Sequence, residues 1–155
     1  EGPCDAIVLG VDPGLSLARL EQTLPQLQDH GADLVCLHRN LFYLDAEGRR
    51  RLGPGAWSGA LQALVTSGTV TTVGKPEPPI YHEALERIGV SAPETLFISD
   101  DPLSDLRGAK RLGMATALVL SGKYRDHGVL GQLDQSEWPD IICSRLADLT
   151  AEIET

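Results

Sequence analysis

Three aspartates within six residues, Asp100, Asp101 and Asp105, are the part of the sequence most able to do chemistry. They follow the apolar run Leu-Phe-Ile-Ser at 96–99, which has the composition of a buried strand. Carboxylates held this close repel one another and usually require a cation between them. Their oxygens suit a hard ion such as Mg²⁺. An Asp before Pro-Leu-Ser-Asp could instead cap a helix, so the pattern leaves a metal site and a helix cap open.

Lys75 is the second candidate, in the sequence Val-Gly-Lys-Pro-Glu-Pro at residues 73–78. The strand-like run at 69–73 precedes it, and Pro76 keeps the chain extended after it. At the end of a strand, its ammonium group could neutralise an oxygen of a phosphoryl or acyl-phosphate group. Most lysines lie on the surface in water, and that is the alternative for Lys75.

The elements that must position these groups alternate between strands and helices. We expect strands at residues 5–11, 33–38, 69–73, 95–99, 115–120 and 139–144, and helices at 16–30, 56–66, 80–89, 102–113 and 145–154. This alternation indicates an α/β fold with a parallel sheet. Because ligands bind beyond the carboxyl ends of parallel strands, we expect Lys75 and Asp100 to face the same edge of the sheet.

Local signals add three expectations to this outline. Pro25 lies inside the first predicted helix and should bend or divide it. The polar loop after the second strand could hold a short hairpin around residues 47–48. The helix before the aspartates carries one apolar stripe, formed by Tyr81, Leu85 and Ile88.

Composition limits the classes of function. The formal net charge of the 155 residues is −9, which argues against a nucleic-acid partner but not against a small phosphorylated substrate. No apolar run is long enough to span a bilayer, so no membrane partner is expected. Cys4, Cys36 and Cys143 form no C-x-x-C motif, which favours reduced thiols and a cytoplasmic protein, with Cys36 in the core.

Taken together, the two candidate stretches resemble a known family. The sequence GKPEPPIYHEALERIGVSAPETLFISDDPLSDLRGAKRLGMATALVLSG, residues 74–122, resembles the second half of a haloacid dehalogenase (HAD) superfamily phosphatase of subfamily IIA. This is the group of p-nitrophenylphosphatase and phosphoglycolate phosphatase. LVCLHRNLFYLDAEGRRRLGPGAW at 34–57 and LSGKYR at 120–125 are similar to its branch containing phospholysine phosphohistidine inorganic pyrophosphate phosphatase. The resemblance covers about residues 4–152.

The resemblance implies roles for four residues. Lys75 matches the lysine of the family's third motif, which steadies the nucleophile and the phosphoryl charge. Asp100 matches the aspartate that binds Mg²⁺, and Asp105 matches the second acid of the same motif and is taken with it as a metal residue. Ser99 stands where the family usually has glycine, so a side chain replaces a close approach of the backbone.

It also implies a domain organisation. Residues 1–71 resemble an α/β cap of the C2 type, and residues 72–155 resemble the C-terminal half of a Rossmann-like core, with a boundary near 68–74. Caps of this kind close over the substrate and often mediate dimers. The expected substrate-facing loop contains His38, Arg39, Asn40 and Tyr43, for which an ordinary polar surface loop is the alternative.

The nucleophile of the family is missing from the expected place. Its D-x-D-G-T motif has only one counterpart here, Ile-Val-Leu-Gly-Val-Asp-Pro-Gly-Leu at 7–15, where Gly10 occupies the nucleophile position. Glycine cannot attack phosphorus. We therefore expect that the N-terminal half of the core is absent, that the chain alone is inactive, and that the strands at 69–73, 95–99 and 115–120 have an unpaired edge.

Three functions follow from these observations. The leading one is a Mg²⁺-dependent phosphatase that acts through an aspartyl-phosphate on a small phosphomonoester or phosphoramide. The alternative is a truncated, inactive module for interaction, which could form a homodimer through the cap. A receiver-type signalling domain is disfavoured, because its acidic pair precedes its lysine whereas Lys75 precedes Asp100 by 25 residues.

Overall fold

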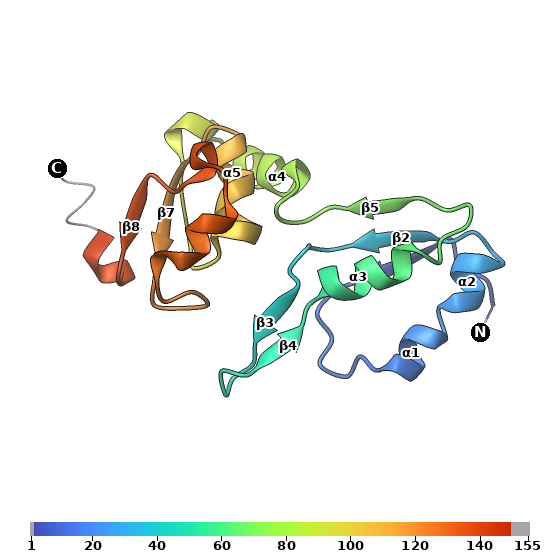
Figure 1. Ribbon diagram of the computed structural model, residues 1–155. Helices are drawn as coiled ribbons and strands as arrows, with labels where there is room; N and C mark the ends of the chain where they lie inside the picture. Colours follow the sequence, from blue (N-terminus) through green and yellow to red (C-terminus); the bar gives the residue numbers. More distant parts are fainter. Residues whose placement is uncertain (1, 150–155) are drawn as a thin grey trace. The chain divides into compact units, whose positions relative to one another are not determined.

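The computed structural model describes residues 2–149, and the chain divides into two compact units, Glu1–Gly74 and Lys75–Thr155 (Figure 1). A boundary is predicted near 68–74, and the division falls after Gly74. The assignment of these units to a cap and to half of a core stays a prediction. Within residues 2–149, none of the helices has the length and apolar character needed to cross a lipid bilayer.

The first unit is built on a three-stranded parallel sheet in the order β1-β2-β5. The strands are β1 (Ala6–Leu9), β2 (Asp33–Cys36) and β5 (Val70–Thr72), with Leu34 opposite Val70. More buried and more exposed side chains alternate along β1 and β2, as expected for a sheet that packs mainly on one face.

Helices cover that buried face. The region expected as one helix at 16–30 forms α1 (Leu17–Glu21) and α2 (Leu24–Gln28), so the prediction that Pro25 divides it is confirmed. Pro25 lies in the first turn of α2, where its missing N–H costs no helical hydrogen bond. The third helix, α3 (Pro54–Gln62), packs along β2 (Figure 1). The core consists of Leu9, Leu20, Leu27, Leu34 and Leu61.

The predicted hairpin is also confirmed. Strands β3 (Phe42–Leu44) and β4 (Arg50–Leu52) pair antiparallel across a turn that includes Asp45. The carboxylate of Asp45 accepts the N–H groups of Glu47 and Arg49 at 3.1 and 2.9 Å, and it also accepts from the Arg49 guanidinium group. These bonds, chiefly the one from the Arg49 N–H, lower the pKa of Asp45 to about 2.

The second unit contains a separate parallel sheet in the order β6-β7-β8. Its strands are β6 (Leu96–Ser99), β7 (Ala115–Val119) and β8 (Ile141–Cys143), and its helices include α4 (Pro78–Ile88) and α5 (Arg107–Arg111). Short 3₁₀ turns complete the unit: η1 (Ala92–Glu94), η3 (His127–Gln132), η4 (Gln135–Glu137) and η5 (Leu146–Asp148). Buried residues around the sheet include Leu106, Ala109, Met114, Ala117, Leu118, Val119 and Leu130. The α/β fold with parallel sheets is thus confirmed.

The three cysteines are free thiols. Cys36 is fully buried, as predicted, because its side chain lies on the core face of β2. Cys143 is buried in β8, and Cys4 is exposed.

One prediction about the sheets is wrong. The strand expected at 69–73 was grouped with those at 95–99 and 115–120, but β5 pairs with β2 in the sheet of the first unit. Strand β6 starts a different sheet, in which β7 is its partner. Hydrophobic runs identify strands but do not choose their partners, which are decided by contacts between distant residues.

Helix boundaries also differ from the predictions. The helix expected at 102–113 begins as a π-helical turn, η2 (Pro102–Leu106), and continues as α5. The apolar stripe on α4 is only partly buried, since Tyr81 is 1% exposed but Ile88 is 65% exposed. Of the closing helix expected at 145–154, the structure describes η5 alone, and residues 150–154 lie outside the described part of the chain.

Candidate functional site

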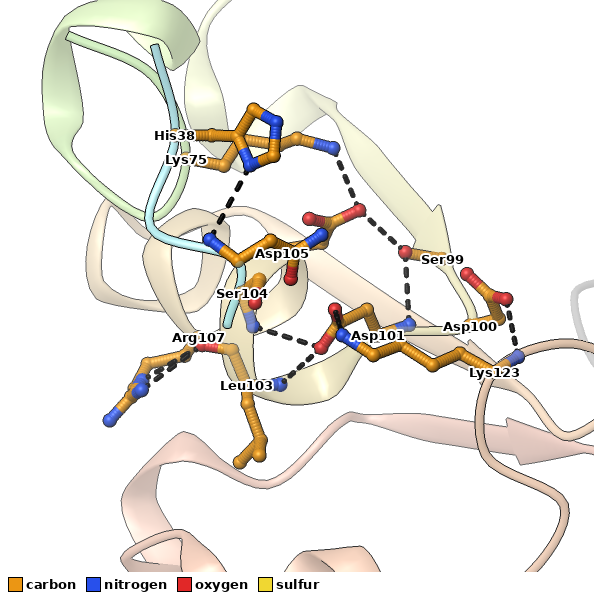
Figure 2. Close-up of polar contacts among 11 residues, drawn as sticks. His38, Lys75, Ser99, Asp100, Asp101, Leu103, Ser104, Asp105, Arg107 and Lys123 are labelled. Carbon is orange, nitrogen blue, oxygen red and sulfur yellow. Dashed lines mark hydrogen bonds and ion pairs between the residues drawn. The ribbon is translucent and has the colours of Figure 1, made fainter. Parts of the chain in front are cut away.

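The candidate site lies at the carboxyl end of β6, where the strand passes into η2 (Figure 2). Ser99 ends the strand, and Asp100 and Asp101 follow it. Pro102 occupies the first helical position, which suits a proline because the N–H of that position has no helical partner. The local sequence therefore places all three aspartates at the ligand-binding edge of a parallel sheet.

Asp101 caps the turn that follows. Its Oδ1 accepts the N–H groups of Leu103 and Ser104 at 3.2 and 3.0 Å. Its Oδ2 accepts from Nζ of Lys123 at 2.6 Å, and the two side chains are only 5% and 11% exposed. The helix-cap alternative is correct for Asp101, and the cation beside this carboxylate is a lysine.

Asp105 holds Lys75. Its Oδ2 accepts from Nζ of Lys75 and from the hydroxyl of Ser99, both at 2.8 Å (Figure 2). The Ser99 hydroxyl in turn accepts the N–H of Asp101 at 3.1 Å. The serine that replaces the usual glycine therefore links two of the aspartates. Lys75 is 40% exposed, so part of its ammonium group faces solvent.

Tyr81 supports the same turn from α4. Its hydroxyl donates to the backbone carbonyl of Asp105 at 2.7 Å, and its ring meets Phe97 of β6 edge to face at 5.5 Å. Burial raises the pKa of Tyr81, and the nearby negative charges of Asp105 and Asp101 raise it further. Tyr81 therefore remains a neutral hydrogen-bond donor at physiological pH.

Of the three aspartates, Asp100 is the one that no described side chain neutralises. Its Oδ2 accepts the backbone N–H of Lys123 at 2.6 Å. Among residues 2–149, no lysine, arginine or histidine side chain pairs with it. One carboxylate oxygen of Asp100 is therefore available for a ligand, which is the property that a metal-binding aspartate needs.

A complete metal site is not formed by the described residues. Nowhere between residues 2 and 149 do three or more histidine, cysteine, aspartate or glutamate side chains gather so that they could hold one ion. Lysine ammonium groups pair with Asp101 and Asp105. Within residues 2–149, the carboxylate of Asp100 could contribute one ligand to a metal ion but could not form a site alone.

The residues expected on a substrate loop all belong to the first unit. Nδ1 of His38 accepts the N–H of Asn40 at 3.4 Å, and the carbonyl of Asn40 accepts the N–H of Gly55 in α3 at 2.9 Å. Arg39 is exposed, and Tyr43 in β3 lines a groove of about 700 Å³. The loop is thus anchored on its own unit, and its role toward a substrate stays a prediction.

Known proteins resemble the second unit and parts of the first. Residues 72–149 match the HAD-hydrolase-like family. The chain belongs to this family. Haloacid dehalogenase-like hydrolase domain-containing protein 2 of Bos taurus is 38% identical over 122 residues, which are 78% of this chain and 46% of the relative. Phospholysine phosphohistidine inorganic pyrophosphate phosphatase of Xenopus laevis is 37% identical over 92 residues, 59% of this chain and 33% of the relative.

A solved structure agrees at the level of the fold. The 4-nitrophenylphosphatase of Thermotoga maritima matches with a TM-score of 0.78 at 24% identity, over 95% of this chain and 54% of that one. The predicted membership of HAD subfamily IIA is confirmed. The chain spans about half the length of the curated relatives it matches, or less.

Two contributors to the site were not predicted from the sequence: Tyr81 as a donor, and Lys123. Lys123 follows the strand-like run at 115–120, just as Lys75 follows another strand-like run. Applying the rule about the carboxyl ends of parallel strands to every strand would have found Lys123. No signal in the sequence indicates that the Tyr81 hydroxyl reaches the Asp105 carbonyl.

Proposed function

We propose that this chain is part of a Mg²⁺-dependent phosphatase that acts on a small phosphomonoester or phosphoramide in the cytoplasm. The observation that carries the proposal is the pairing of Lys75 with Asp105 beside an unneutralised Asp100, at the carboxyl end of a parallel strand. Membership of a hydrolase family supports it. No nucleic acid or membrane is part of the proposed reaction.

Lys75 has the arrangement of a group that meets a phosphoryl oxygen. Asp105 holds the ammonium group of Lys75, and the Ser99 hydroxyl in turn holds the Asp105 carboxylate. An ammonium group has three N–H donors, and Lys75 is 40% exposed, so donors remain for a substrate. Positioned in advance, such a donor stabilises the charge that develops on a transferring phosphoryl group.

Asp100 would hold the Mg²⁺ ion, with Lys123 orienting its other oxygen. A bound Mg²⁺ would offset phosphoryl charge and orient the substrate. The proposal assigns the remaining ligands and the nucleophilic aspartate, on which the aspartyl-phosphate forms, to residues outside this sequence. The support for that assignment is Gly10 at the nucleophile position and the length of the relatives beyond the shared part.

The test is hydrolysis of p-nitrophenyl phosphate by the full-length protein and by the 155-residue chain, each with Mg²⁺ and with EDTA. We expect turnover by the full-length protein that requires Mg²⁺, and none by the chain alone. Lys75→Met should lower kcat about 10²- to 10³-fold. Lys110→Met is the matched control, because Lys110 pairs with Asp140 outside the site. Turnover by the chain alone would contradict the assignment of the nucleophile.

The second candidate function is an interaction module that forms a homodimer through the first unit. Two observations favour it: Gly10 at the nucleophile position, and large apolar side chains exposed on the sheet of that unit, with Val8 62% and Val70 38% exposed. It requires a dimer of the chain in sedimentation equilibrium and no turnover by the full-length protein. A monomeric chain would exclude it.

A further inference from the structure

The loop at residues 120–124, directly after β7, contacts both aspartates at the end of β6 (Figure 2). A single residue makes both contacts. The backbone N–H of Lys123 donates to Oδ2 of Asp100 at 2.6 Å, and its Nζ donates to Oδ2 of Asp101, also at 2.6 Å. The position of the loop and the orientation of the Asp100 carboxylate are therefore linked through Lys123.

Gly122 shows how closely the loop approaches. A Cβ atom placed on Gly122 would lie 1.9 Å from Oδ2 and 2.6 Å from Cγ of Asp100. Only a residue without a side chain permits that distance. The carboxylate thus has backbone against it on one side, and a displacement of the loop would release its orientation.

The Lys123 ammonium group fixes the loop to Asp101. The pair with Asp101 is almost entirely removed from water, at 11% and 5% exposure. Asp101 is itself fixed, because it caps η2 through the N–H groups of Leu103 and Ser104. A buried ion pair to a rigid partner favours one position of the loop, since moving the loop would leave the buried Asp101 carboxylate without its cation.

We propose that Lys123 is a positioning residue: its ammonium group anchors the loop on Asp101 so that its N–H orients Asp100 for a divalent cation. The proposal rests on the proposed function, because that function assigns the cation to Asp100. Removing the Lys123 side chain would change cation binding in two opposite ways. Removing a positive charge alone would strengthen cation binding, whereas losing the orientation weakens it.

A double variant separates the two effects. Lys123→Met with Asp101→Asn leaves the net charge unchanged and leaves no buried charge unpaired, and asparagine still caps η2. The matched control is Lys110→Met with Asp140→Asn, which removes the other lysine–aspartate pair of the second unit in the same way. We expect the full-length protein with the first double change to bind Mg²⁺ about 10- to 100-fold more weakly by calorimetry. The control should bind like the unchanged full-length protein.

A second measurement needs no metal. Amide hydrogen exchange at residue 123, followed by NMR, reports whether its N–H stays bonded to Asp100. We expect faster exchange in the double variant and unchanged exchange in the control. Lys123→Arg should retain both slow exchange and Mg²⁺ affinity, because a guanidinium group can also pair with Asp101.

The outcomes distinguish this proposal from the proposed function. Unchanged exchange at residue 123, or Mg²⁺ binding as strong as before, in the first double variant would overturn the role of Lys123. A full-length protein that binds no Mg²⁺ would contradict the proposed metal function of Asp100. In that case the exchange rate alone supports or overturns the anchoring of the loop.

Discussion

Replacing Asp101 with alanine removes two interactions with one change. The carboxylate caps η2 through its Oδ1 and neutralises the Lys123 ammonium group through its Oδ2. Asparagine at the same position keeps the cap and loses only the charge. The pair of variants Asp101→Ala and Asp101→Asn therefore measures the two interactions separately.

The magnitude follows from the burial of the pair. Loss of an N-cap side chain costs about 1 kcal/mol. Breaking a buried pair by removing one partner costs about 3–5 kcal/mol, because the other charge stays out of water. The higher range applies here because Lys123 and Asp101 are 11% and 5% exposed. We expect a loss of about 4–6 kcal/mol for Asp101→Ala and about 3–5 kcal/mol for Asp101→Asn.

Urea unfolding measures these losses in the unit that contains the pair. Trp57 lies in the first unit and Trp138 in the second, so replacing either tryptophan with phenylalanine leaves a fluorescent probe for the other unit. With an m-value of about 2 kcal/mol per molar urea, the Trp138 midpoint should fall by about 2–3 M in Asp101→Ala. A loss below about 1 kcal/mol, which is the range of exposed pairs, would refute the argument from burial.

Three further predictions concern the surroundings of the site and the hairpin. Tyr81→Phe should cost about 1–3 kcal/mol in urea unfolding, because it leaves the carbonyl of Asp105 without its donor; an unchanged midpoint would contradict this. Gly108→Ala should cost about 1–3 kcal/mol in the same assay, since its Cβ would lie 2.5 Å from the Tyr81 hydroxyl, and a stability equal to the unchanged chain would show that the helix shifts freely. The pKa of Asp45 is lowered to about 2, so its stabilisation of the hairpin should be complete above about pH 4 and lost as the pH falls toward 2; an NMR titration that places this pKa near 4 would be the contrary result.

The elements that the sequence predicted well are those decided by local chemistry. Pro25 had to interrupt its helix because the ring cannot continue the hydrogen-bond ladder, and the structure begins α2 there. The hairpin forms around a turn whose Asp45 side chain replaces missing backbone partners. In both cases the decisive residues lie within a few positions of each other.

Other features depend on contacts that no short window contains. The local sequence around Val70 does not say which of the two sheets its strand joins. The structure pairs Val70 with Leu34 in the sheet of the first unit. Likewise, the helical pattern places Ile88 on the same stripe as Tyr81. Only the tertiary structure shows that Tyr81 is buried and Ile88 is exposed. The partner of an apolar face is a property of the whole fold.

The three aspartates illustrate the same limit inside the site. Sequence spacing places Asp100, Asp101 and Asp105 at one edge but does not say which of them remains available to a ligand. The lysines decide this. Lys75, before α4, pairs with Asp105, and Lys123, after β7, pairs with Asp101. Because lysines pair with the other two carboxylates, the prediction that a cation binds at this edge of the sheet concerns Asp100.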